Sequence, residues 1–307
     1  MAEGNISLIM EFMLLGFSDL PNLQGFLFGL FLIIYTGILI GNGLIIVITK
    51  VEPVLQTPMY FFLRNFSFLE ICYTSVILPR ILVNLWTQKI NISFTACAAQ
   101  FCAFFVMAIT ENFLLTVMAY DRYVAICKPL NYPLIMNHRV CVCLVAGSWV
   151  SGIPFHILLT YLIFSLPFCG SKKLDHIFCD IRPLLKLACG DTSVNEFSFY
   201  VIVLIVGVLP FLLIMCSYVK IITTILKVPG TKGRSKAFST CSSHLIVVLL
   251  YLGCGIITYL RPSSSHSVGL DKVFSIIYTT VTPMFNPIIY SLRNKDVVFA
   301  LKKLLHK

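Results

Sequence analysis

Charged side chains that lie within long apolar stretches are the residues of this chain best placed to do chemistry. Asp121 and Arg122 stand in the string MAYDRYVAIC at the end of one stretch, and Glu70 and Glu111 lie deep within two stretches. Ionisable residues inside a membrane are costly and rare, so each is a candidate functional residue. Because two buried carboxylates of like charge cannot both ionise cheaply, we expect Glu70 and Glu111 to share a proton or a cation.

An acid pair can also indicate a hydrolase of the aspartyl type, and the segment His176-Ile177-Phe178-Cys179-Asp180 can suggest a metal site. The sequence supplies neither a nucleophile nor a set of metal ligands beside the acids, and a disulfide-bonded Cys179 is no longer a thiolate ligand. We therefore predict that the chain has no catalytic residues and is not an enzyme, and we expect no metal site in that segment.

Asp121 and Arg122 are placed where a membrane-spanning helix would meet the cytoplasm. One interpretation is an interfacial ion pair, in which the long Arg122 side chain reaches the lipid headgroups. We favour a second interpretation, in which the adjacent acid holds Arg122 and a helix bundle stays closed on its inner side. Release of this latch would open a cytoplasmic cleft, which is the behaviour of a receptor.

Seven apolar stretches must position these residues. The 307 residues are 58% hydrophobic and 12% charged, whereas soluble domains have about a quarter of charged residues. A helix needs roughly 20 apolar residues to cross a bilayer. The stretches are residues 23–49, 58–78, 96–127, 140–164, 197–226, 237–260 and 273–292. We predict an all-α membrane protein, a single seven-transmembrane helix bundle over residues 1–307.

The basic residues indicate which side of the membrane is inside, because cytoplasmic loops carry an excess of Lys and Arg. Residues 1–22 contain neither, and the formal net charge of +10 gathers in the segments that lie inside if the N-terminus is outside. We expect an extracellular segment 1–22 with a glycosylation site at Asn5, and a cytoplasmic tail 293–307 with a short amphipathic helix. The positive charge then sets the orientation of the chain in the membrane and contacts lipid headgroups, and no nucleic-acid partner is expected.

Twelve cysteines are present, and most lie within the spans, where a thiol is usually a small apolar packing group. Four fall on the predicted outer side, in an oxidising environment: Cys97, Cys169, Cys179 and Cys189. Because four cysteines permit three pairings, these positions alone leave the disulfide pattern open.

Seven strings along the chain, each in the appropriate span, carry a family resemblance. They are FMLLGFS at 12–18, GN at 41–42, LQTPMYFFL at 55–63, MAYDRYVAICKPLNYPLIM at 118–136, SY at 217–218, KAFSTCSSHL at 236–245 and PMFNPIIYSLRN at 283–294. With these strings the chain resembles, over nearly its whole length, the odorant receptors, a branch of the rhodopsin-like G-protein-coupled receptors. It departs from the family pattern at Leu252, where an aromatic residue is usual, and at Glu70, where aspartate is frequent.

The resemblance implies roles for residues that the pattern alone does not assign. Tyr218 and Tyr290 would receive Arg122 when the latch opens, and His244 either pairs with the same group or is a packing residue. Glu70 would lie with Asn42 and Asn286 around a polar core that holds sodium in many receptors of the superfamily, with Glu111 nearby. The implied disulfides are Cys97 with Cys179 and Cys169 with Cys189.

A ligand pocket is expected in the outer half of the bundle, on the faces of the third, fifth and sixth spans that point inward. The residues assigned to it are Phe104, Phe105, Ala108, Ile109, Ile202, Val206, Ile256 and Tyr259. Tyr259 is the expected hydrogen-bond donor. No aspartate lies near Phe104, so an ion pair with an amine ligand is not expected.

The function implied by the resemblance is that of an odorant receptor at the plasma membrane. It would bind a small, largely apolar volatile ligand and activate a heterotrimeric stimulatory G protein of the olfactory type, which raises cyclic AMP. One alternative is a chemoreceptor for a small metabolite in another tissue. A seven-span channel or transporter is another, although transporters tend to show repeated halves and no repeat is visible here. The sequence names neither the odorant nor the oligomeric state, and it leaves open whether Leu252 alters the activation switch.

Overall fold

The computed structural model describes residues 11–169, 171–227, 241–242, 244–261, 268–291 and 295–305. The predicted glycosylation site Asn5 lies outside the described residues, and so does the side chain of Tyr290.

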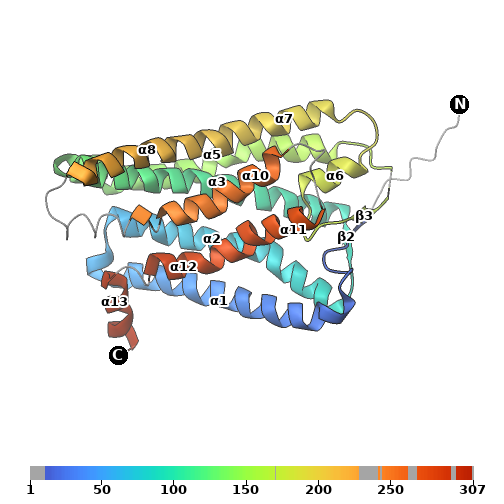
Figure 1. Ribbon diagram of the computed structural model, residues 1–307, viewed down its shortest axis with the longest axis horizontal. Helices are drawn as coiled ribbons and strands as arrows, with labels where there is room; N and C mark the ends of the chain where they lie inside the picture. Colours follow the sequence, from blue (N-terminus) through green and yellow to red (C-terminus); the bar gives the residue numbers. More distant parts are fainter. Residues whose placement is uncertain are drawn as a thin grey trace, which may run out of the picture.

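The chain forms a bundle of long helices that run side by side (Figure 1). The first four spans are α1 (Gln24–Val51), α2 (Pro58–Thr87), α3 (Phe94–Cys127) and α5 (His138–Phe164). The fifth is continuous through α7 (Ser193–Val203), a π-helical turn (Leu204–Val208) and α8 (Leu209–Lys227). The sixth covers His244–Leu260, with a π-helical turn at Leu249–Gly253 followed by α10 (Cys254–Leu260). The seventh consists of α11 (Val268–Ile276), a π-helical turn (Ile277–Val281) and α12 (Thr282–Ser291).

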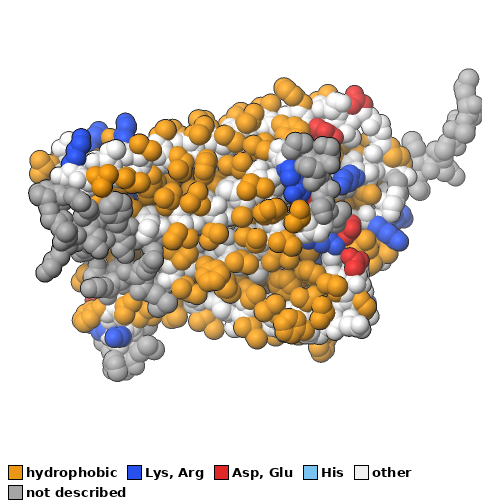
Figure 2. Space-filling model, viewed as in Figure 1, with side chains coloured by type: hydrophobic (Ala, Val, Ile, Leu, Met, Phe, Trp, Pro, Cys, Tyr) orange, Lys and Arg blue, Asp and Glu red, His pale blue; other side chains and the backbone are white. Residues whose placement is uncertain are grey.

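This arrangement agrees with the predicted seven-helix membrane bundle. The first five spans are each long and apolar enough to cross a bilayer, and the described part of the sixth is a shorter apolar helix. On the face shown in Figure 2, hydrophobic side chains cover the middle of the bundle, and coloured charged side chains gather toward its two ends. Large apolar side chains such as Phe26, Ile33 and Tyr161 are exposed, as expected for residues that face lipid tails.

Local sequence signals explain where several spans begin. The Ser93 side chain accepts a hydrogen bond from the backbone N–H of Ala96 at the start of α3, at 3.2 Å. Asn137 does the same for Val140 at the start of α5, at 3.0 Å. Pro58 opens α2, at a position where its missing N–H would have no helical partner. Ser93 and Asn137 each pair a backbone N–H that would otherwise have no partner at the start of a helix, and Pro58 has no such N–H to pair.

A small sheet, absent from the all-α prediction, covers part of the outer end. β1 (Glu11–Leu14) pairs antiparallel with β2 (Asn91–Ser93) and parallel with β3 (Lys173–Leu174). Phe12 and Leu14 point into the protein and are fully buried. These strands are too short for a periodic pattern, and their partners are far apart in the sequence, so sequence reading had no signal for them.

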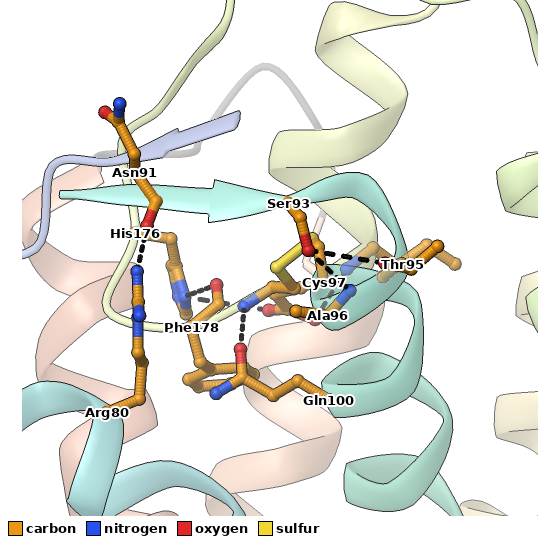
Figure 3. Close-up of a disulfide and its surroundings, with 12 residues drawn as sticks. Arg80, Asn91, Ser93, Thr95, Ala96, Cys97, Gln100, His176 and Phe178 are labelled. Carbon is orange, nitrogen blue, oxygen red and sulfur yellow. Dashed lines mark hydrogen bonds and ion pairs between the residues drawn. A yellow bond between two sulfur atoms is a disulfide. The ribbon is translucent and has the colours of Figure 1, made fainter. Parts of the chain in front are cut away.

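Two disulfides hold the long loop between the fourth and fifth spans, with the pairings that the resemblance implied. Cys97 at the top of α3 joins Cys179, with their Cα atoms 5.6 Å apart, and Cys169 joins Cys189 across the loop, at 5.9 Å. Figure 3 shows the first of them, with Gln100 pointing toward the loop backbone. The Gln100 Oε1 atom accepts a hydrogen bond from the Cys179 N–H at 3.1 Å, so the loop is tied to α3 twice within one turn.

The inner end carries short helices. α4 (Tyr132–Ile135) follows α3, and α13 (Lys295–Leu305) follows the seventh span and turns away from the bundle axis (Figure 1). Val297 and Ala300 of α13 are buried, whereas Lys302 and Lys303 are exposed. The Lys303 ammonium pairs with the Glu52 carboxylate at 2.9 Å. The helix therefore has the amphipathic character that the sequence predicted.

The disulfides lead to a prediction about stability. Peptide mapping of folded protein under non-reducing conditions should recover the pairs Cys97–Cys179 and Cys169–Cys189, and any other pairing would contradict the fold. The first bond closes a loop of 82 residues and the second a loop of 20. Loss of the first, in Cys97→Ala/Cys179→Ala, should therefore destabilise the protein by about 1 kcal/mol more than Cys169→Ala/Cys189→Ala. Thermal unfolding in detergent measures the difference.

Candidate ligand-binding and signalling sites

An apolar cavity of about 80 Å³ lies between the spans in the outer half of the bundle. All the residues that the sequence assigned to a ligand pocket line it, from Phe104 of α3 to Tyr259 of α10. Further lining residues were not foreseen: Tyr73, Asn112, Leu159, Phe199, Val203, Gly207, Tyr251, Leu252, Gly255 and Tyr278. No charged residue in the described part of the chain lines the cavity. The structure thus brings the predicted residues together, while their contact with a ligand remains a prediction.

Aromatic rings form the upper wall of this cavity. The Phe104 ring lies 4.7 Å from the ring of Phe178, 5.0 Å from Phe105 and 5.4 Å from Tyr73. Phe178 precedes Cys179, so the disulfide to α3 fixes the loop ring against Phe104. Aromatic pairs at such distances are favourable beyond the area that they bury.

A chain of hydrogen bonds closes the cavity on its outer side. The Tyr259 hydroxyl donates to Asp180 Oδ1 at 3.2 Å and lies 2.9 Å from the Tyr278 hydroxyl. Ser275 continues the chain, at 3.3 Å from Tyr278 and 3.2 Å from His176 Nε2. Tyr259, the expected hydrogen-bond donor to the ligand, thus already donates to Asp180 here, and its contact with a ligand stays a prediction. Sequence reading missed this because Asp180 lies 79 residues away.

Burial governs the charge state of the loop groups in this chain of hydrogen bonds. Desolvation raises the pKa of the Asp180 carboxyl, although His176 and the Ile181 N–H act against the shift. Desolvation also lowers the pKa of His176, so its imidazole is neutral at extracellular pH. The two side chains are 3.9 Å apart. Because burial disfavours both charged forms, hydrogen bonds rather than an ion pair hold the loop here.

The predicted polar core lies among the first, second, third and seventh spans. Asn42, Glu70, Glu111 and Asn286 are all buried, and the Asn286 amide donates to Glu70 Oε1. Asn42 instead donates to the Ile38 carbonyl at 3.1 Å. Within the described residues, five oxygens of this group have no hydrogen-bond partner: Asn42 Oδ1, Glu70 Oε2, both carboxyl oxygens of Glu111 and Asn286 Oδ1. Unpaired buried oxygens of this kind suit a hard cation, so the residues present fit a sodium ion.

At the inner end of the bundle, Arg122 contacts the adjacent acid, while the predicted latch role stays a prediction. Its guanidinium contacts the Asp121 carboxylate at 2.5 Å, and the same carboxylate accepts from the Tyr132 hydroxyl at 2.8 Å. Burial and the nearby acid raise the pKa of Tyr132, which keeps its hydroxyl a donor. Tyr218 pairs with His244 Nδ1 at 2.8 Å and leaves Arg122 to Asp121. Sequence reading named four of these five residues and missed Tyr132, which stands in the quoted string KPLNYPLIM.

Comparisons with known proteins identify the family of this chain. The family model described as "Olfactory receptor" matches residues 31–307. The chain belongs to the olfactory receptor family. It is 58% identical to human olfactory receptor 10AG1, over 97% of this chain and 99% of that protein. It is 52% identical to human olfactory receptor 10A5, over 100% and 97%, and 48% identical to mouse olfactory receptor 5AP2, over 98% and 95%. It is therefore a multi-pass membrane receptor and not an enzyme.

This olfactory receptor has a second, larger cavity of about 400 Å³ at its outer mouth. Its lining includes many charged or titratable residues: Lys173, Asp175, His176, Asp180, Arg182, Lys186, Glu196 and Asp271. Phe199 lines both cavities. The Arg182 side chain donates to the carbonyl oxygens of Tyr259 and Arg261 at 2.8 and 3.1 Å, which joins the loop to the outer end of the sixth span. The outer cavity thus has charged side chains in its lining, whereas the inner cavity has none among the described residues.

Gly255 provides a test of the inner cavity in this olfactory receptor. It lines the cavity, and a Cβ atom at this position would meet nothing within 4 Å. Gly255→Val should therefore place its side chain in ligand space, and should weaken the larger ligands by about tenfold or more while it spares the smallest. Dose–response curves over a series of ligand sizes measure this effect.

The matched control is Gly253→Val. A Cβ there also meets nothing within 4 Å, but Gly253 does not line the cavity. If both variants shift the curves equally, the cavity is not where ligands bind.

Proposed function

We propose that this chain is an odorant receptor that binds a small, uncharged volatile ligand in the apolar cavity and activates a stimulatory G protein of the olfactory kind at the plasma membrane. The observation that carries the proposal is the apolar cavity between the spans, which is free of charged lining residues within the described chain. An ionic ligand would lose its hydration there without a counter-charge, so neutral molecules fit best.

The ligand and the G protein act at opposite ends of the bundle in this proposal. Arg122 follows Phe104 by 18 residues on α3, a distance of roughly 27 Å at about 1.5 Å per residue. No small molecule touches both. A ligand can open the inner end only if it binds the open state more tightly than the closed one. Linkage is reciprocal, so the G protein raises agonist affinity in turn.

The sixth span is the element that joins the two ends. It carries the cavity residues Ile256 and Tyr259 and, further inside, His244. A displacement of this span breaks the bond between His244 and Tyr218, which frees the Tyr218 hydroxyl to receive Arg122. Leu252 stands in place of the aromatic residue usual in the family. It lines the cavity, so a bound ligand would contact it directly.

A sodium ion at the polar core belongs to the same proposal. Asn42, Glu70, Glu111 and Asn286 would hold it, and its single positive charge would balance one ionised carboxylate of the buried pair. Membrane lipid surrounds the bundle, and the basic inner face contacts the headgroups.

A ligand screen on cells that express the receptor tests the function. Neutral volatile molecules should evoke cyclic AMP in a concentration-dependent manner and evoke no ligand-gated current. If the strongest agonists are organic cations, the assignment of an apolar site is wrong. A current without cyclic AMP would instead indicate a channel.

Arg122 should be required for signalling but not for ligand binding. Arg122→Ala removes the partner of Asp121 and the group that Tyr218 receives, so agonist-evoked cyclic AMP should be lost while low-affinity binding remains. Arg139→Ala is the matched control, because Arg139 is an exposed arginine at the inner end of α5. Surface expression is measured for both variants. Full signalling by a well-expressed Arg122→Ala receptor would contradict the latch.

A further inference from the structure

The polar side chains that line the inner cavity differ in whether their hydrogen bonds are already made. Tyr259 and Tyr278 bond to each other, and Tyr251 donates to the Ala108 carbonyl at 3.3 Å. Asn112 Oδ1 and the Tyr73 hydroxyl are buried, and neither has a hydrogen-bond partner among the described residues. A cavity-lining group of this kind is available to a ligand, because pairing it relieves the penalty of a buried, unpaired polar atom.

The orientation of the Asn112 amide is set by its neighbour on the fifth span. Its Nδ2 donates to the Val206 carbonyl at 2.8 Å, within the π-helical turn Leu204–Val208. The reversed amide would place Oδ1 against that carbonyl oxygen, and two acceptors repel. The free end of the side chain is therefore the oxygen, which accepts hydrogen bonds and cannot donate them.

Asn112 lies deep in the cavity. It follows Phe104 by eight residues on α3, or roughly 12 Å along the helix. The α3 residues that line the cavity between these two levels are apolar: Phe105, Ala108 and Ile109. A ligand that fills this space would place its apolar body near the aromatic rings around Phe104 and present one polar atom to Asn112.

We propose that Asn112 determines ligand specificity and that the receptor prefers neutral ligands with a hydroxyl group, alcohols or phenols, that donate to Asn112 Oδ1. This inference rests on the proposed function, because it names the ligand class of the same cavity. Aldehydes, ethers and esters can only accept, and they leave Oδ1 unpaired. The Tyr73 hydroxyl can either donate or accept, so it does not discriminate between the two classes. Ammonium donors are disfavoured because no described carboxylate lines the cavity to balance their charge.

Matched odorants on the unaltered receptor are the first test. Octanol is compared with octanal and octyl methyl ether, and 2-phenylethanol with its methyl ether, by cyclic AMP dose–response. The alcohols should act at concentrations about tenfold lower than their partners, which is the order expected for one buried hydrogen bond. Equal potency within the pairs overturns the inference while the proposed function stands. Failure of all these probes and of a broad volatile panel contradicts the proposed function, and the inference falls with it.

Variants then assign the preference to Asn112. Asn112→Leu has similar bulk and no acceptor, so the gap between alcohol and ether should close. If that receptor does not reach the cell surface, the smaller Asn112→Ser, which is too short to keep both contacts, is judged by the same comparison. Thr116→Val is the matched control: Thr116 lies one turn further inside, donates to the Asn112 carbonyl at 2.8 Å and does not line the cavity. A preference that persists in an expressed Asn112 variant, or that Thr116→Val also removes, overturns the assignment.

Discussion

The attachment of the outer loop to α3 is the constraint on which the ligand site depends. The Cys97–Cys179 disulfide and the bond from Gln100 to the Cys179 backbone act within one turn of the same helix. They place Phe178 on Phe104 and bring Asp180 within reach of Tyr259. Without this attachment the lining residues Phe104 and Tyr259 would lose their partners in the loop.

The third span orders the remaining functional groups along one axis. It packs against α2, α5 and α8, so its side chains meet most of the bundle. From outside to inside it carries the disulfide at Cys97, the aromatic ring of Phe104, the polar residues Glu111 and Asn112, and Asp121 and Arg122 at the inner end. Other segments supply partners at three of these levels: Phe178 from the outer loop, Val206 from the fifth span and Tyr132 from α4.

Sequence reading succeeded where the signal was local and periodic. Hydrophobic runs predict the spans, and helical spacing placed residues such as Phe104 and Ala108 on an inward face. It failed where a contact joins distant segments. The β1 strand pairs with residues some eighty positions away, the Tyr259 hydroxyl donates a hydrogen bond to a loop acid, and Asn112 is oriented by a carbonyl of another span. None of these contacts leaves a pattern in a single stretch of sequence, because each depends on how the helices pack. The proposed latch at Arg122 rests on the surrounding string and the family resemblance, because the position of Arg122 alone also allows a simple interfacial ion pair.

The outer sheet has a consequence for the order in which the receptor matures. β1 leaves the ribosome first, but its partners β2 and β3 follow only after two spans and four spans respectively have been synthesised. The first strand must therefore wait on the outer side, with Phe12 and Leu14 uncovered, until most of the bundle has been inserted. Non-local pairing of this kind is slow, because loop closure precedes the contacts that stabilise it. Completion of the sheet is thus a late event in biogenesis, and until then the nascent receptor displays an apolar strand that chaperones of the secretory pathway can bind.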